Sequence, residues 1–253
     1  MSNNLYIIAG CNGAGKTTAS FNILPELLDC KEFVNADAIA AALSPFQPET
    51  VAFEAGRIML KRIDELLLKN VDFAIETTLA TKSYHQLIKR AQAQNYKVGL
   101  LFFWLNSPEM AVERVKSRVE KGGHHIPTDV IFRRYERGIK NLFEIYVHIC
   151  DDVSIYDNTR FKKELIATNK DLSYLKILNQ SKMRQMQNVV GEPREHYMNA
   201  HTMKIDDALA IHYRKLVEKT IAENSYLVVS NDDGEIIRKY APELKLELEA
   251  GLI

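Results

Sequence analysis

The chain has 253 residues, and its 33 lysines and arginines balance 33 aspartates and glutamates, so the formal net charge is zero. This balance argues against a protein held to nucleic acid by bulk positive charge. Hydrophobic residues make up 46% of the chain, which is enough for a buried core and too much for a disordered protein. Three cysteines are too few for a disulfide framework and favour a reducing compartment. No membrane span or signal peptide is evident, so we expect a cytoplasmic protein without membrane contacts.

Short strand patterns alternate with helix patterns over the first 160 residues. Strands are predicted at residues 5–9, 33–34, 73–75, 98–105 and 153–156. Helices are predicted at residues 16–28, 51–69, 83–94, 107–121 and 127–143. This order predicts an α/β fold of the P-loop NTPase type, with helices on both faces of a parallel sheet. Ligands of such sheets bind at the carboxyl ends of the strands.

The composition changes after this region. Residues 179–199 are rich in Gln, Asn, Lys, Arg and Met and are expected to form a linker or a loosely attached helix. A helix is predicted at residues 204–223, followed by strands at 226–230 and 235–238 around an Asn-Asp-Asp-Gly turn. The expected organisation is a main domain (1–178), a linker (179–199) and a small helix–hairpin module (200–253).

Residues 10–17 fit the pattern G-x-x-x-x-G-K-[ST] without a mismatch. Glycines let successive amides face phosphate oxygens, and the helix that follows adds its positive end. A glycine-rich loop can also be only a tight turn, but this one follows a strand and opens a helix. ATP and Mg²⁺ are therefore expected, with Lys16 on the phosphates and the Thr17 hydroxyl on the metal. The predicted nucleotide-binding residues are Gly10, Cys11, Asn12, Gly13, Ala14, Gly15, Lys16, Thr17 and Thr18.

Signatures of transport ATPases (LSGGQ) and of GTPases (N-K-x-D) are missing from the sequence, which leaves a kinase. A kinase of this architecture needs a base for the acceptor hydroxyl and a second polar group that orients the acceptor or the metal. Asp37 and Glu76 follow the second and third predicted strands and are the candidates for these roles. Each could instead cap a helix or lie exposed in a loop.

A basic lid is predicted between residues 114 and 137, where two helices meet at Gly122-Gly123. Such a lid could screen the charge of the transferred phosphate, although the same segment could be a solvated helical hairpin balanced by glutamates. His124-His125 is expected to contact substrate or to lie exposed, because adjacent histidines rarely share one metal ion. The arginines available for phosphate contact are Arg114, Arg118, Arg133, Arg134 and Arg137.

Over residues 5–168 the chain resembles the zeta-toxin family of P-loop kinases. The resemblance rests on the strings IIAGCNGAGKTT, FVNAD, FAIETTL, SPEMAVERVKSRVEKGGHHIP and YDNT in this order. It implies phosphate transfer from ATP to a hydroxyl of a UDP-amino sugar, with UDP-N-acetylglucosamine as the usual acceptor, in a toxin of a toxin–antitoxin system. It also implies that Asp37 is the base and that Glu76 and Thr78 face the acceptor.

The lid departs from the family pattern. Zeta toxins carry an arginine just before the corresponding proline, where this chain has His124-His125-Ile126. The arginine's role could pass to Arg133 or Arg134, with Arg118 as a further catalytic candidate and His124 as a substrate contact.

The C-terminal module loosely resembles the small proteins encoded beside such kinases, which suggests a built-in inhibitor; a structural extension or oligomer contact is the alternative. Two other functions stay open. A polynucleotide kinase would need aromatic stacking residues beside the lid, for which Phe132 and Tyr135 are the candidates. A nucleotide-gated binding module would bind ATP without turnover.

Overall fold

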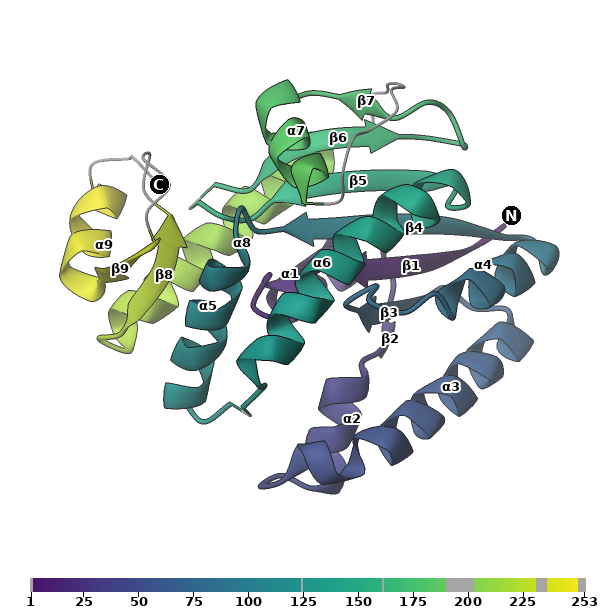
Figure 1. Cartoon of the computed structure of the whole chain (residues 1–253), viewed down its shortest axis with the longest axis horizontal. Coiled ribbons are helices and arrows are strands. Elements are labelled where there is room, and N and C mark those ends of the chain that lie inside the picture. Colours follow the sequence, from purple (N-terminus) through teal and green to yellow (C-terminus); the bar gives the residue numbers. More distant parts are fainter. Residues whose placement is uncertain (1, 124, 161, 190–202, 231–235, 250–253) are drawn as a thin grey trace.

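A seven-stranded sheet, in the order β2-β3-β1-β4-β5-β6-β7, forms the centre of the structure, a computed structural model that describes residues 2–123, 125–160, 162–189, 203–230 and 236–249. Figure 1 shows helices on both faces of this sheet, as the sequence predicts. The strands are β1 (Asn3–Ala9), β2 (Glu32–Val34), β3 (Phe73–Thr77), β4 (Tyr96–Trp104), β5 (Asp152–Asp157), β6 (Glu164–Asn169) and β7 (Lys176–Ile177). The helices of this part are α1 (Lys16–Leu27), α2 (Ala36–Leu43), α3 (Ala52–Lys69), α4 (Tyr84–Ala93), α5 (Pro108–Glu120), α6 (Thr128–Glu144) and α7 (Gln180–Asn188), with short 3-10 helices η1 (Pro48–Val51) and η2 (Tyr146–His148).

Strand β1 lies in the middle of the sheet because it pairs in parallel with β3 on one side and β4 on the other. Its residues Leu5, Ile7 and Ile8 are at most 1% exposed, as expected for a strand covered on both faces. At its carboxyl end Ala9 is level with Thr77 of β3 and Phe102 of β4. The loop that follows β1 therefore emerges at the centre of the sheet edge where ligands bind.

Helix α5 begins where its sequence predicts. The Ser107 hydroxyl accepts a hydrogen bond from the Met110 amide at 3.2 Å, and Pro108 occupies the first turn. Helix α6 packs closely on the loop after β3, because a side chain at Gly138 would meet the Thr78 carbonyl oxygen at 2.5 Å. This contact brings α6 beside the end of β3.

The sheet extends further than predicted. Strands β6 and β7 add antiparallel to the otherwise parallel sheet, and neither was expected. Part of the expected 179–199 linker is helix α7, which is capped by Asn179 and packs on β6. It is not loosely attached, because Met183 and Met186 are at most 1% exposed in the main core. The rest of that segment lies outside the described residues.

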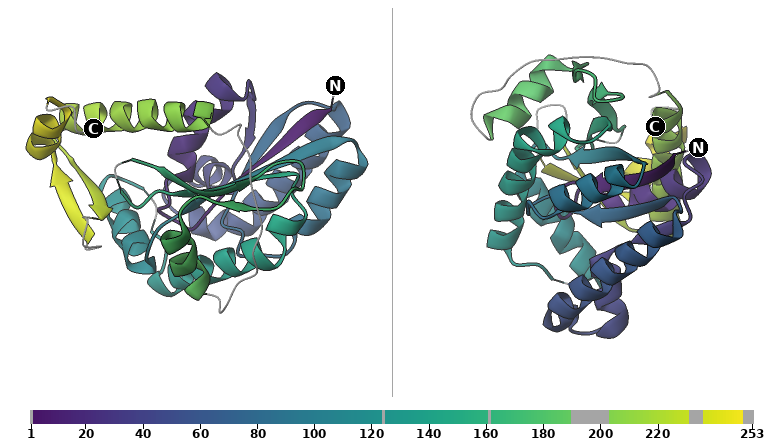
Figure 2. Two further views of the ribbon diagram at one scale, coloured as in Figure 1. Left: turned by 90° about the horizontal axis from the view of Figure 1, so that it is seen from above. Right: turned by 90° about the vertical axis from the view of Figure 1, so that its right-hand side faces the viewer.

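The C-terminal part contains α8 (Met203–Ala222), β8 (Tyr226–Ser230), β9 (Ile236–Tyr240) and α9 (Ala241–Glu249). Strands β8 and β9 form the expected antiparallel hairpin, whose predicted turn at residues 231–234 lies outside the described residues. Helix α9 was not predicted. Helix α8 packs along α1 and β8 along α5, as the views of Figure 2 also show. In the described part of the chain, no helix combines the length and the apolar character that crossing a membrane requires.

Candidate active site

The loop between β1 and α1 curls tightly at the end of β1. Gly10 has a φ of 137°, and a side chain there would meet the Phe103 carbonyl oxygen at 2.2 Å, so only glycine fits this position. Within this loop, Gly10, Cys11 and Ala14 are buried. Burial raises the pKa of Cys11 to about 11, so its thiol stays neutral. The predicted loop residues that line the adjoining cavity are Asn12, Gly13, Gly15, Lys16, Thr17 and Thr18.

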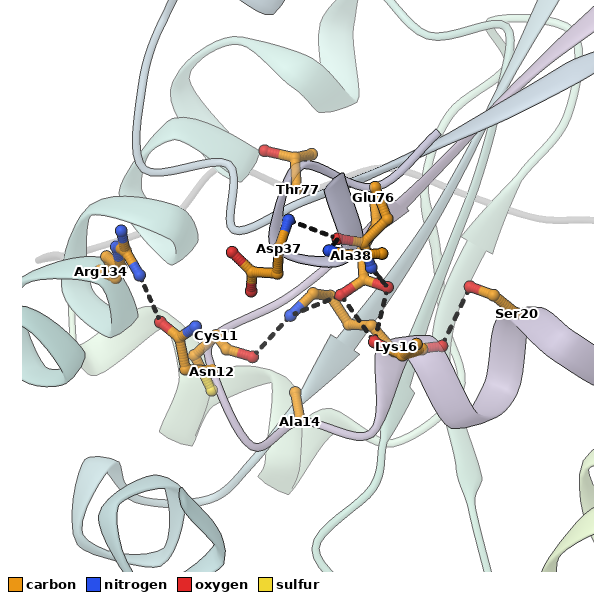
Figure 3. Close-up of polar contacts among 12 residues, drawn as sticks. Cys11, Asn12, Ala14, Lys16, Ser20, Asp37, Ala38, Glu76, Thr77 and Arg134 are labelled. Atoms are coloured by element: carbon orange, nitrogen blue, oxygen red, sulfur yellow. Dashed lines mark hydrogen bonds and ion pairs between the residues drawn. The ribbon is translucent and has the colours of Figure 1, made fainter. Parts of the chain in front are cut away.

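The Lys16 side chain lies across the loop and is held at both sides (Figure 3). Its ammonium donates a hydrogen bond to the Cys11 carbonyl oxygen at 3.0 Å and lies 3.6 Å from the Glu76 carboxylate. Only 6% of Lys16 is exposed, and the pairing with Glu76 offsets the cost of burying the charge. The ammonium is thus fixed beside the amides of the loop, where a phosphate would meet both.

Glu76 connects the ends of three elements. Its carboxylate accepts hydrogen bonds from the Thr17 hydroxyl at 2.8 and 3.0 Å and from the Asn35 side-chain amide at 2.9 Å. Asn35 also caps α2, because its side-chain oxygen accepts from the amides of Asp37 and Ala38. Sequence reasoning missed Asn35, although its place before a helix inside the FVNAD string was a usable signal.

Asp37 lies in the first turn of α2, exposed to the cavity. Asn35 serves as the helix cap, so the alternative interpretation of Asp37 as a cap is wrong. In Figure 3 the Asp37 carboxylate faces the side of the loop that holds Lys16. A carboxylate so placed can receive a proton from a hydroxyl that approaches the loop from the β2 side.

Asn158 ties the loop to the other side of the sheet. Its side-chain amide donates to the Ala14 carbonyl oxygen at 2.7 Å, and its own backbone amide donates to Trp104. Asn158 is 8% exposed and follows β5 directly. It was not predicted as a site residue, although it belongs to the YDNT string of the resemblance.

The cavity beside the loop has a volume of about 610 Å³, within the usual range for small-molecule sites. Its walls are rich in cations, and Arg160 and Lys163 among them were not predicted. Burial lowers the pKa of Lys163 to about 8, and nearby Arg114 lowers it as well. Burial also lowers the pKa of Arg114 to about 10, which leaves this side chain charged at neutral pH. The cationic residues of the walls are Lys16, Arg114, Arg118, Lys121, Arg160 and Lys163.

The predicted lid arginines have different surroundings. Arg134 donates to the Asn12 side-chain oxygen in the loop at 3.1 Å, and Arg118 lines the cavity. Arg133 does not join them, because it is exposed and lies 3.7 Å from Asp129 one turn away on its own helix. Arg114 is half-buried and donates to the carbonyl oxygens of Thr159 and Val228, so it joins segments of the protein together.

The other predicted contact and stacking residues are Thr78, His124, Phe132 and Tyr135. Thr78 is half-buried beside Glu76 but does not line the cavity, and predicted contact His124 lies outside the described residues. Tyr135, a candidate for base stacking, is 2% exposed; its hydroxyl donates to Leu105 and accepts from Trp104. Phe132 packs against the core. Tyr135 is therefore too buried to stack on a base, and Phe132 is partly covered by the core.

Comparisons with known proteins agree with this fold. An uncharacterised protein of Haemophilus influenzae is 32% identical over 137 residues, which are 53% of this chain and 94% of that protein. The structure from the PezAT chromosomal toxin–antitoxin system of Streptococcus pneumoniae superposes with a TM-score of 0.55 and 18% identity, covering 86% of this chain and 87% of that one. An AvrRxo1-ORF1:ORF2 structure with ATP has a TM-score of 0.60 and 13% identity, covering 85% and 76%.

The sequence model of the zeta toxin family matches residues 2–171. This match includes the loop at residues 10–17, Asp37, Glu76 and Asn158. Because well over half of its residues lie in this match, the protein belongs to the zeta toxin family and is a kinase.

Proposed function

We propose that the protein transfers the terminal phosphate of ATP to a hydroxyl of a nucleotide sugar, of which UDP-N-acetylglucosamine is the expected example. The observation that carries this proposal is that the phosphate loop and the exposed carboxylate of Asp37 line one cavity. Phosphate transfer depends mostly on positioning and charge compensation, and both are built into this arrangement.

The residues divide the work by position. The amides of residues 10–17 and the Lys16 ammonium hold the phosphates of ATP, with Thr18 as a further contact. Asp37 accepts the proton of the acceptor hydroxyl while the acceptor oxygen bonds to phosphorus. The bond from phosphorus to the bridging oxygen breaks, and ADP leaves. Arg118 and Arg134 lie where they can offset the charge on the phosphate during transfer.

The residues present fit a magnesium ion. The Thr17 hydroxyl and the Glu76 carboxylate are within 3.0 Å of each other, and oxygen atoms of these kinds are the ligands that Mg²⁺ prefers. When bound, Mg²⁺ would supply charge neutralisation at the phosphates. Glu76 would then hold the ion, directly or through water, more than it would contact the acceptor.

The activity can be tested with purified protein, ATP and Mg²⁺. UDP-N-acetylglucosamine, other UDP-sugars and 5′-hydroxyl oligonucleotides are offered separately, and phosphorylated products are identified by mass spectrometry. We expect a phosphorylated UDP-sugar, no product with Lys16→Ala, and no product with Asp37→Asn despite normal ATP binding. Phosphorylated oligonucleotides alone would favour a polynucleotide kinase. Tight ATP binding without turnover on any acceptor would favour a nucleotide-gated binding module.

We also propose a toxin role with a separate antitoxin protein as the partner. The support is that PezAT is described as a toxin–antitoxin system, and that the chain shares its fold. Expression of the wild-type protein should then slow bacterial growth, whereas Lys16→Ala should not. Equal growth with both proteins would contradict a toxin role that acts through the kinase site.

A further inference from the structure

The cavity has two chemically different ends. Asp37 follows β2 and Glu76 lies near the end of β3, so both carboxylates are on one side of β1 in the sheet. An acceptor that reaches Asp37 must therefore enter from that side. The rest of a nucleotide whose phosphates occupy the loop then extends toward β4 and β5 on the other side. Six residues of α8 and β8 line the cavity there: Tyr213, Leu216, Tyr226, Leu227, Val228 and Val229.

This wall is firmly attached to α5. Arg114, which is half-buried, donates to the Val228 carbonyl oxygen at 3.0 Å, and Lys121 donates to the Tyr226 carbonyl oxygen at 3.0 Å. The cationic groups of Lys121 and Arg238 lie 4.8 and 4.7 Å from the centre of the Tyr226 ring. Arg238 in turn lies 3.6 Å from Glu120 on α5. These contacts with α5 and the residue that follows it hold the wall in position beside the cavity.

The wall also has the right chemistry for a nucleobase. Leu216 and Leu227 are half-buried at the cavity surface, and Tyr213 is 8% exposed beside them. Flat aromatic bases are bound by apolar and aromatic side chains that exclude water from their faces. Arg118 and Arg160 also line the cavity, and their planar guanidinium groups can stack on the faces of a base. Residues 213–229 lie beyond the 2–171 match to the family.

We propose that residues 213–229 form the base-side wall of the nucleotide pocket, so that the C-terminal module helps to bind the phosphate donor. This inference rests on the proposed function, since it takes the nucleotide to be ATP. It gives the module a role different from the built-in inhibitor considered from the sequence. The module borders a cavity of about 610 Å³ beside the loop and leaves it open, as a binding wall must.

The first test compares ATP with inorganic tripolyphosphate, which has the phosphates but no base, by calorimetry on the full-length protein. Leu216→Asn and Leu227→Asn should each weaken ATP binding by about tenfold, as expected for a lost base contact, and leave tripolyphosphate binding unchanged. Leu246→Asn is the matched control, because Leu246 lies on α9 and is 68% exposed. It should change neither affinity. Unfolding midpoints confirm that each variant is folded.

The outcomes separate the inference from the proposed function. The inference is overturned if both wall variants bind ATP with wild-type affinity. It is also overturned if they bind ATP more tightly, which is the result expected if the module obstructs the pocket. Equal weakening of ATP and tripolyphosphate also overturns it. Lys16→Ala should weaken both ligands; if it weakens neither, the phosphate site itself is wrong and the proposed function fails.

A second measurement needs no variant. Photolysis of the wild-type protein with 8-azido-ATP should label peptides that contain residues 213–229, and excess ATP should prevent the labelling. Label confined to peptides around Asp37 and Glu76 would place the base on the opposite side and overturn the inference.

Discussion

Replacing Asn158 with alanine removes the side chain that joins the phosphate loop to β5. The Ala14 carbonyl oxygen, in a residue with no exposed surface, would lose its 2.7 Å hydrogen bond. Leaving such a group unpaired costs about 1–3 kcal/mol. In a protein of this size each kcal/mol lowers the unfolding midpoint by about 2–4 °C, so a clear shift in thermal unfolding is expected.

The same change should weaken ATP binding. Without Asn158 the loop must be ordered when the nucleotide binds, and each 1.4 kcal/mol or so of that cost raises Kd about tenfold. Asn179→Ala is the matched control, since Asn179 caps α7, which packs on β6, and the loss of a cap costs about 1 kcal/mol of stability. We expect reduced stability in both variants but reduced ATP affinity, measured by calorimetry, only in Asn158→Ala. Unchanged affinity in Asn158→Ala, or an equal loss in the control, would refute the reasoning.

Three other predictions test neighbouring contacts. Arg134→Ala should lower kcat at least about tenfold, whereas Arg133→Ala should leave it near the wild-type value; steady-state kinetics compares the two, and equal effects would contradict the assignment. Asn35→Ala should lower the free energy of unfolding by about 1 kcal/mol, as measured in denaturant, because α2 loses its cap; an unchanged value would argue against the cap. Folding lowers the pKa of Lys163 from 10.5 to about 8, so stability should rise with pH between these values while affinity for ATP falls as Lys163 loses its charge. Lys163→Arg should flatten both trends in melting and calorimetry at pH 7–10, and trends that persist would implicate another group.

The central elements of the fold could be predicted because their signals are local. A continuous apolar run marks β4, and Ser107-Pro108 marks the start of α5. Strand β6 could not be found this way, since its pairing with β5 depends on contacts that only the folded sheet provides. Helix α7 could not be predicted because its polar composition resembles that of a linker. Only a few of its residues, such as Met183 and Met186, are buried.

The candidate site divides in the same manner. The loop motif and the residues after β2 and β3 were predictable, because the sheet architecture gathers strand ends at one edge. Which lid arginine faces the loop was not predictable from spacing: Arg133 and Arg134 are adjacent, yet only Arg134 contacts Asn12. The cations Arg160 and Lys163 belong to no motif, and tertiary packing alone brings them to the cavity.

The pairing of Lys16 with Glu76 has a consequence for selectivity among anions. The Glu76 carboxylate lies 3.6 Å from the Lys16 ammonium. Because it is negatively charged, it competes with any phosphate that approaches this lysine. Bare anions are therefore disfavoured, while a nucleotide that arrives together with a divalent cation gives the glutamate a new counterion. An acid set at the centre of an anion site in this way would discriminate against free phosphate and uncomplexed ATP alike.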